Sequence, residues 1–165
     1  MAQTLIDLAP PSLRCEIVDW SEVQVFNQDT EANPPAANAA FKDRIGKAQA
    51  VLFATPEYNH AMPGVLKNAL DWLSRDTPEG EVLLEKPIAV LGASGGPWGT
   101  RLAQASLRQV LHACGALVMP TPTVFVANAT ARFDDKGVLT DLTTARSLQR
   151  FLLAFDHWLT RVAPP

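Results

Sequence analysis

The sequence predicts an α/β fold in which helices cover both faces of a parallel β-sheet, giving a three-layer sandwich. Strand-like and helix-like segments alternate along the chain, which is the order produced by parallel strands joined by crossover helices. The run Pro87–Leu91 is apolar at every position, as expected for a central strand buried on both faces. With 165 residues, the chain has a common single-domain length, and we expect one domain over residues 1–165.

The first half of the chain predicts three helices and two strands. A helical pattern over Ala2–Leu8 ends at a pair of prolines, and the alternating segment Arg14–Trp20 is typical of a strand. After a polar, proline-containing loop, the pattern predicts a helix over Ala36–Ala48 and a strand over Ala50–Ala54. The next helix is expected over Pro63–Ser74, with a buried stripe formed by Val65, Leu66, Ala69, Leu70 and Leu73.

The second half repeats the scheme. After the strand Pro87–Leu91, a helix is expected over Thr100–Ala113. A further strand begins at Leu117–Met119 and resumes at Val124–Val126 after two prolines, a pattern that suits an edge strand. Thr140 is expected to cap a last helix that reaches Val162.

Composition narrows the class of protein. The residues are 47% apolar and 19% charged, which favours a globular chain over a disordered one. The net charge is −3 and the basic residues are scattered, so we expect no nucleic-acid partner. No stretch approaches the roughly 20 apolar residues of a membrane span, and no signal-peptide pattern opens the chain. We therefore expect a cytoplasmic protein.

The cysteines and histidines give no sign of a metal site. Cys15 and Cys114 each lie in an apolar stretch, which predicts two buried structural thiols. His60, His112 and His157 are far apart and lack the spacing of metal ligands.

The loop after the strand Ala50–Ala54 is the most distinctive part of the sequence. It lies where α/β proteins bind ligands, beyond the carboxyl end of a strand. Pro56 restricts the backbone, Asn59 offers a short amide, and Tyr58 offers an aromatic face. Taken alone, such a loop is also consistent with an ordinary strand-to-helix connection.

The longer run P-E-Y-N-H-x-x-P-G-x-L-K-N-A-x-D-W, residues 56–72, resembles the signature of the NAD(P)H-dependent FMN reductases. This flavodoxin-like family includes quinone, chromate and azo-dye reductases, and the resemblance extends over the chain from about Ala2 onward. It implies FMN as cofactor, NAD(P)H as electron donor, and hydride transfer through the flavin to a quinone-like or other small acceptor. It also implies a homodimer or homotetramer, with candidate contacts at Val25–Asp29 and Leu73–Val82.

The same resemblance implies which residues of this loop contact the cofactor. They are Pro56, Glu57, Tyr58, Asn59 and His60. For Glu57, contact with the flavin and contact with a partner subunit both remain open. The flavin carries the redox chemistry in such enzymes, so no separate catalytic side chain is expected.

A second loop, Gly92-x-Ser-Gly-Gly-x-x-Gly99, follows the central strand. Its glycines permit close backbone approach to a ligand, but the spacing matches neither a Walker loop nor the dinucleotide fingerprint. Taken alone, the loop is weak evidence, and a tight strand-to-helix turn is the default interpretation. The resemblance implies a second flavin loop, with contacts from Ser94, Gly95, Gly96 and Trp98. Trp98 could instead lie in a subunit contact, and Arg101 could meet a nicotinamide phosphate or solvent.

One part of the family pattern has no match. The family opens with a strand and a phosphate loop, G-S-x-R-x-x-S, and a strand–helix–strand unit takes roughly 30 residues. In this sequence the next strand candidate already begins at Arg14. We therefore expect a sheet that lacks the usual first strand, and weak or absent FMN binding by this chain. The alternative function is a non-catalytic flavodoxin-like module that has lost tight FMN binding.

Overall fold

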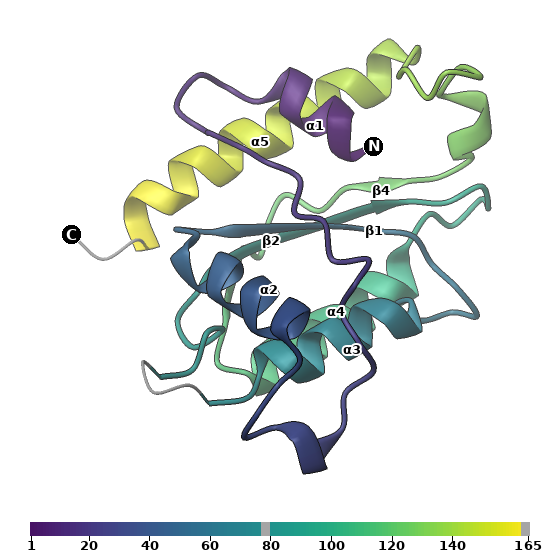
Figure 1. Cartoon of the computed structure of the whole chain (residues 1–165). Coiled ribbons are helices and arrows are strands. Elements are labelled where there is room, and N and C mark those ends of the chain that lie inside the picture. Colours follow the sequence, from purple (N-terminus) through teal and green to yellow (C-terminus); the bar gives the residue numbers. More distant parts are fainter. Residues whose placement is uncertain (77–79, 163–165) are drawn as a thin grey trace.

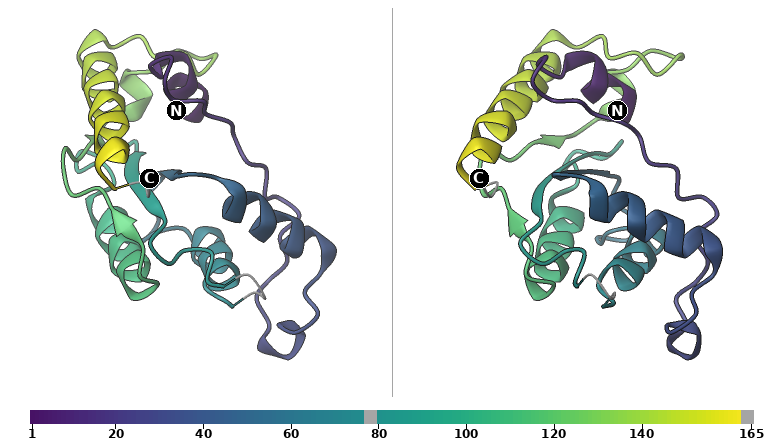
Figure 2. Two further views of the ribbon diagram at one scale, coloured as in Figure 1. Left: turned by 90° about the vertical axis from the view of Figure 1, so that its left-hand side faces the viewer. Right: turned by 60° about the vertical axis from the view of Figure 1, so that its left-hand side comes forward.

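The computed structural model describes residues 1–76 and 80–162, and in it helices cover both faces of a parallel sheet (Figure 1). Helices α1 (Ala2–Leu8) and α5 (Leu142–Val162) lie on one face. Helices α2 (Ala36–Lys47), α3 (Gly64–Leu73) and α4 (Arg101–Ala113) lie on the other, as the two views of Figure 2 also show. The predicted three-layer architecture is confirmed.

Strand β2 (Pro87–Ala93) is the centre of the sheet. It pairs in parallel with β1 (Val51–Thr55), in a register that runs from Val51 opposite Ile88 to Thr55 opposite Gly92. On its other side, the first residues of β2 pair with β3 (Leu117–Val118) and its last residues pair with β4 (Phe125–Val126). Because β3 and β4 share one side of β2, they form a single edge strand in two pieces. The predicted interruption by prolines is confirmed.

The hydrophobic core lies in two layers, one on each face of β2. Successive side chains of a strand point to opposite faces, so Ile88 and Val90 pack against α2, α3 and α4, whereas Ala89 and Leu91 pack against α1 and α5. All four side chains have no exposed surface. The prediction of a central strand buried on both faces is therefore correct.

The predicted strand Arg14–Trp20 is wrong. The segment runs as a loop, and within the described residues no backbone hydrogen bond joins it to β1. Its alternation has another cause: Val18 and Trp20 pack on the core beside α2, with Trp20 stacked on Phe41 at 6.2 Å between ring centroids, while Ile17 faces solvent. One-sided packing on a helix produces the same alternating pattern as one face of a sheet.

The two cysteines differ in how far they are buried. Cys15 belongs to this loop and is exposed, so its predicted burial is wrong. Cys114 is half-buried and packs against the core on the α2–α4 side. Partial burial raises the pKa of both thiols, since desolvation disfavours a thiolate.

Segment 24–26 is fastened by side chains from two helices. The carbonyl oxygen of Gln24 accepts hydrogen bonds from Asn38 Nδ2 at 3.2 Å, Asn68 Nδ2 at 3.1 Å and Trp72 Nε1 at 2.8 Å. The Asn68 Oδ1 atom accepts the backbone N–H of Phe26 at 2.7 Å. This explains why Trp72, which was not expected in the buried stripe of α3, is buried there.

Two local predictions need correction. Val65, placed in the buried stripe of α3, is 68% exposed, because it lies on the side of the first turn that faces away from the sheet. Helix α5 is capped by Asp141 and not by Thr140. The Asp141 carboxylate accepts the backbone N–H of Thr144 at 2.7 Å and its hydroxyl at 2.5 Å, the usual N-cap geometry, whereas the Thr140 hydroxyl donates to the carbonyl of Arg132.

The ends of β1, β2 and helix α4 meet at Gly92. A Cβ atom at this position would lie 2.2 Å from the carbonyl oxygen of Thr55 and 2.4 Å from Thr100 Oγ1. Both distances are far below van der Waals contact, so only glycine allows the two strand ends and the start of α4 to approach this closely.

We predict that Gly92→Ala lowers the free energy of unfolding by about 3 kcal/mol or more, because its methyl group overlaps a fixed backbone oxygen. Gly46→Ala is the matched control: its Cβ would meet nothing nearer than 3.9 Å, and in helix α2 alanine should stabilise by up to about 1 kcal/mol. Urea unfolding followed by circular dichroism measures both. Equal effects of the two substitutions would contradict the close packing at Gly92.

The cap of α5 predicts a pH dependence. Hydrogen bonds from Thr144, and then the Arg132 guanidinium, hold the pKa of Asp141 below its ordinary range. A lowered pKa in the folded state gives stability that is complete above the unfolded-state pKa, about 3.9, and is lost as the pH falls through the folded-state value. Asp141→Asn keeps a capping side chain without the charge. We expect it to be less stable than the wild type at pH 7, with the gap closing in thermal melts taken between pH 5 and pH 2.

Candidate functional site

Two loops leave the same edge of the sheet. Because β1 and β2 are adjacent and parallel, their carboxyl ends at Thr55 and Ala93 lie side by side, and the loops that follow them begin together (Figure 1). The first loop leads into α3 and the second into α4. This edge is where α/β sheets of this kind bind their ligands.

The first loop contains a tight turn that presents three side chains to solvent. The N–H of Tyr58 donates to the carbonyl of Ala61 at 3.1 Å, and the N–H of Ala61 donates back at 3.0 Å. Between them, Asn59 and His60 have φ of 50° and 62°, and two successive positive values define a type I′ turn. Asn59 and His60 are exposed at its tip, and Tyr58 is 61% exposed.

Glu57 joins the first loop to helix α4. Its Oε2 atom accepts the backbone N–H groups of Leu102 at 2.8 Å and Ala103 at 2.9 Å, and only 12% of its side chain is exposed. The carboxylate thus satisfies two free donors at the positive end of the helix, where the side chain of Thr100 makes no capping hydrogen bond. The carboxylate therefore caps α4, and the two roles expected for Glu57, contact with the flavin or with a partner subunit, stay predictions.

The glycine-rich loop is open along its backbone. The Ser94 hydroxyl donates to the carbonyl of Gly99 at 2.8 Å and so closes the loop on itself. A Cβ atom at Gly95 or Gly96 would meet its nearest neighbour only at 3.9 or 3.8 Å, and among the described residues no hydrogen bond engages the N–H of either glycine. Trp98 is 70% exposed. Free donors and an uncovered aromatic ring therefore lie next to the first loop.

The predicted site residues thus come together at one edge in two groups. Glu57 and Ser94 use their side chains inside the protein. The others are exposed and free to meet a ligand: Pro56, Tyr58, Asn59, His60, Gly95, Gly96 and Trp98. Arg101 is also exposed, with its guanidinium 5.5 Å from the centroid of the Phe125 ring.

Sequence reasoning missed a third segment at this edge, residues 126–129. Ser94 N–H donates to the carbonyl of Val126 at 3.0 Å, Asn128 N–H to that of Gly96 at 3.0 Å, and Ala129 N–H to that of Ser94 at 2.9 Å. These bonds continue the β2–β4 pairing beyond the strands. No local pattern marks the segment, because its partners lie more than 30 residues earlier in the chain.

Two hollows in the surface lie away from the predicted site residues. A hollow of about 690 Å³ lies between residues 16–23 and α2, and another of about 510 Å³ lies between residues 19–25 and the start of α3. No predicted site residue lines either hollow. Among residues 1–76 and 80–162, no group of three or more His, Cys, Asp or Glu side chains is placed to hold a metal ion. Within the same residues, no helix has the length and apolar character needed to cross a bilayer.

A parallel sheet with exposed aromatic rings and open glycine backbone at its carboxyl edge is the arrangement of an α/β protein whose ligands bind beyond the ends of its strands. Comparison with known proteins agrees. Residues 1–131 match the family model described as NADPH-dependent FMN reductase. The chain belongs to this family and is an oxidoreductase, and FMN and NAD(P)H are the cofactors of the family.

Individual relatives cover nearly the whole chain. An NAD(P)H-dependent FMN reductase of Pseudomonas aeruginosa is 41% identical over 97% of this chain and 86% of its own length. A 2-hydroxy-1,4-benzoquinone reductase of Burkholderia is 38% identical over 96% and 86%. The solved structure of FerB, a flavoenzyme NAD(P)H:(acceptor) oxidoreductase from Paracoccus denitrificans, has a TM-score of 0.88 at 34% identity, over 98% of this chain and 88% of FerB. The predicted flavodoxin-like fold is therefore correct.

We predict that Glu57→Gln lowers the free energy of unfolding by about 1–2 kcal/mol, because the amide keeps the shape of the cap but loses its charge at the helix terminus. Glu16→Gln is the control: it removes one partner of an ion pair with Arg44 in which both side chains are more than half exposed, and such pairs contribute about 0.5 kcal/mol or less. Urea titrations measure the free energy of unfolding of both variants. Equal losses in the free energy of unfolding would show that the Glu57 cap contributes no more than an exposed ion pair.

Proposed function

We propose that this chain holds the ring of FMN between the loops 56–60 and 94–98 and serves hydride transfer from NAD(P)H to a quinone-like acceptor. The observation that carries the proposal is the pairing of two exposed aromatic side chains, Tyr58 and Trp98, with free backbone donors at Gly95 and Gly96 on adjacent loops. A relative named for the reduction of a hydroxybenzoquinone supports a quinone-like acceptor.

The residues present fit a flavin ring. Such a ring is flat and carries hydrogen-bond acceptors and donors along its edge, which backbone N–H groups and the Asn59 amide can meet. The Tyr58 ring is free to cover one face. FMN supplies the hydride and electron chemistry when bound. The chain orients the ring, and the type I′ turn keeps Asn59 and Tyr58 in place while it does so.

We expect the affinity of this chain for FMN to be modest. Anions such as phosphate bind well at free helix N-termini, but at α4 the N–H groups of Leu102 and Ala103 already donate to the Glu57 carboxylate. That carboxylate also repels a phosphate brought near it. The described part of this edge therefore favours the ring of FMN over its phosphate.

We also propose a homodimer or homotetramer. Val25, in the proposed contact Val25–Asp29, is 83% exposed although its neighbours Gln24 and Phe26 are fastened to α3. The second proposed contact, Leu73–Val82, includes residues 77–79, which lie outside the described residues. Sedimentation equilibrium tests the assembly, and a single species of monomer mass at micromolar concentration would contradict it.

We predict that added FMN develops a shifted visible band and quenched fluorescence with the wild type, and that Tyr58→Ala and Trp98→Ala each weaken binding about three- to tenfold, because stacking on a ring contributes about 0.5–1.5 kcal/mol. Leu153→Ala is the control, since Leu153 is also exposed but lies on α5, away from the site. The titration is followed at constant protein concentration, and NAD(P)H oxidation with a benzoquinone is then measured.

The outcomes separate the two functions. Flavin binding with quinone-dependent NAD(P)H oxidation supports the reductase. No spectral change at any FMN concentration overturns the proposal and leaves the non-catalytic module. If the aromatic variants bind FMN as the wild type does, the site lies elsewhere on the chain.

A further inference from the structure

The glycine-rich loop is held in position by hydrogen bonds to another segment of the chain. Its backbone is bonded to the segment 126–129, which we call the bracing segment, through the three hydrogen bonds that involve Ser94 and Gly96 described above. Gly95 makes no comparable contact, and its nearest neighbour on the Cβ side is the Thr130 methyl group at 3.9 Å. Whatever fixes the bracing segment therefore fixes the free donors of the glycine-rich loop.

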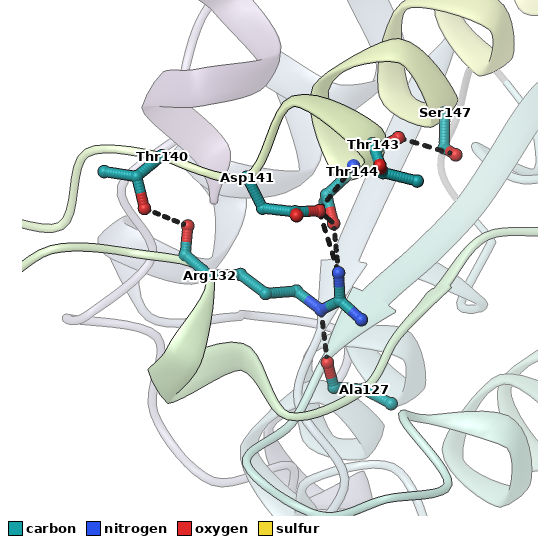
Figure 3. A network of polar contacts seen from close by, with 7 residues as sticks. All are labelled: Ala127, Arg132, Thr140, Asp141, Thr143, Thr144 and Ser147. Atoms are coloured by element: carbon teal, nitrogen blue, oxygen red, sulfur yellow. Dashed lines mark hydrogen bonds and ion pairs between the residues drawn. The ribbon is translucent and has the colours of Figure 1, made fainter.

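Val126 belongs to β4 and pairs with β2, and Arg132 adds a second fastening, which ties the bracing segment to the start of α5 (Figure 3). Its Nε donates to the carbonyl of Ala127 at 2.7 Å. Its second nitrogen, Nη1, donates to Asp141 Oδ2 at 2.8 Å and to Thr144 Oγ1 at 3.0 Å. The guanidinium thus joins the backbone of the bracing segment to the capped start of α5.

The partners of Arg132 are themselves fixed. Asp141 Oδ2 is held by the N–H and hydroxyl groups of Thr144, and Thr144 is buried against the core. The carbonyl of Arg132 accepts the N–H of Thr140 at 2.8 Å, so its backbone is tied to the same turn. The guanidinium bridge therefore ties the bracing segment to groups that have hydrogen-bond partners of their own.

We infer that Arg132 is a positioning residue of the cofactor site: through Ala127 and the bracing segment, it sets where the N–H groups of Gly95 and Gly96 lie. The inference rests on the proposed function, which assigns those donors to the flavin ring. Arg132 touches neither the ring loops nor a reacting atom, so its effect passes entirely through the backbone at residues 94–96 and 127–129.

An arginine is required for this bridge. Its planar fork directs Nε and Nη1 at fixed angles, one toward Ala127 and one toward Asp141. A lysine carries a single ammonium at the end of a flexible stem. In Arg132→Lys the ammonium can keep the ion pair with Asp141, and with it the cap of α5, while the bond to Ala127 is lost. This variant therefore separates the positioning role from a general stabilising one.

The test is amide hydrogen exchange of the whole chain, with Arg132→Lys compared with the wild type. The matched control is Arg146→Lys, an exposed arginine on helix α5, the helix to whose start Arg132 is bonded. We expect exchange at the amides of Ser94, Asn128 and Ala129 to become about tenfold faster in Arg132→Lys, as for a lost hydrogen bond to a charged group. Exchange in α3 and in the middle of α5 should stay as in the wild type, and the control should change nothing.

Two exchange results would overturn the inference. One is unchanged protection at Ser94, Asn128 and Ala129. The other is a uniform loss of protection over the sheet and α5, which would make Arg132 a stabilising residue only. Both are measured without FMN, so they decide the positioning role even if the chain binds no flavin and the proposed function fails.

A second measurement links the position of the loop to the ligand. If the wild type binds FMN, Arg132→Lys should raise its dissociation constant about tenfold and alter the visible band of the bound flavin, while Arg146→Lys should leave both unchanged. An Arg132→Lys protein with faster loop exchange but wild-type affinity and spectrum would overturn the link to the cofactor.

Discussion

The parallel pairing of β2 constrains everything that happens at the carboxyl edge of this sheet. In the described part of the chain, β1, β3 and β4 each pair with β2 and with no other strand. The end of β2 at Gly92 lies so close to Thr55 and Thr100 that no side chain fits between them. The close approach of Gly92 to the backbone of Thr55 and the side chain of Thr100 therefore brings together the starting points of the two loops and of helix α4.

Electrostatics at this edge follows from the same arrangement. The start of α4 is a natural anion site, yet Glu57 from the neighbouring loop fills it. The side chains that remain exposed here include the aromatic and amide groups of Tyr58, Asn59 and Trp98, with His60 and Arg101 beside them. An edge of this kind suits a flat, weakly charged ring, in agreement with a family whose members act on flavins and, in several named cases, on quinones.

The long apolar run and the long motif were predictive, whereas shorter local patterns and contacts with distant partners were not. The apolar run Pro87–Leu91 and the motif beginning at Pro56 led correctly to the central strand and to the family. The alternation over Arg14–Trp20 failed, because alternation shows that one side is buried but not whether a strand or a helix covers it. The cap by Glu57 joins residues 45 positions apart, and the bridge by Arg132 ends on the carbonyl of Ala127, a backbone group that the sequence does not distinguish from any other.

The three donors on the carbonyl oxygen of Gln24 have a practical consequence. Asn38, Asn68 and Trp72 hold the backbone of segment 24–26, whereas the side chain of Val25 is mostly exposed to solvent. The conformation there is thus dictated by residues elsewhere in the chain, and the identity of residue 25 is left unconstrained by the fold. A spectroscopic label attached at this position would be joined to a backbone that is held by hydrogen bonds. Its signal would therefore report rotation of the whole molecule and not local motion of the backbone.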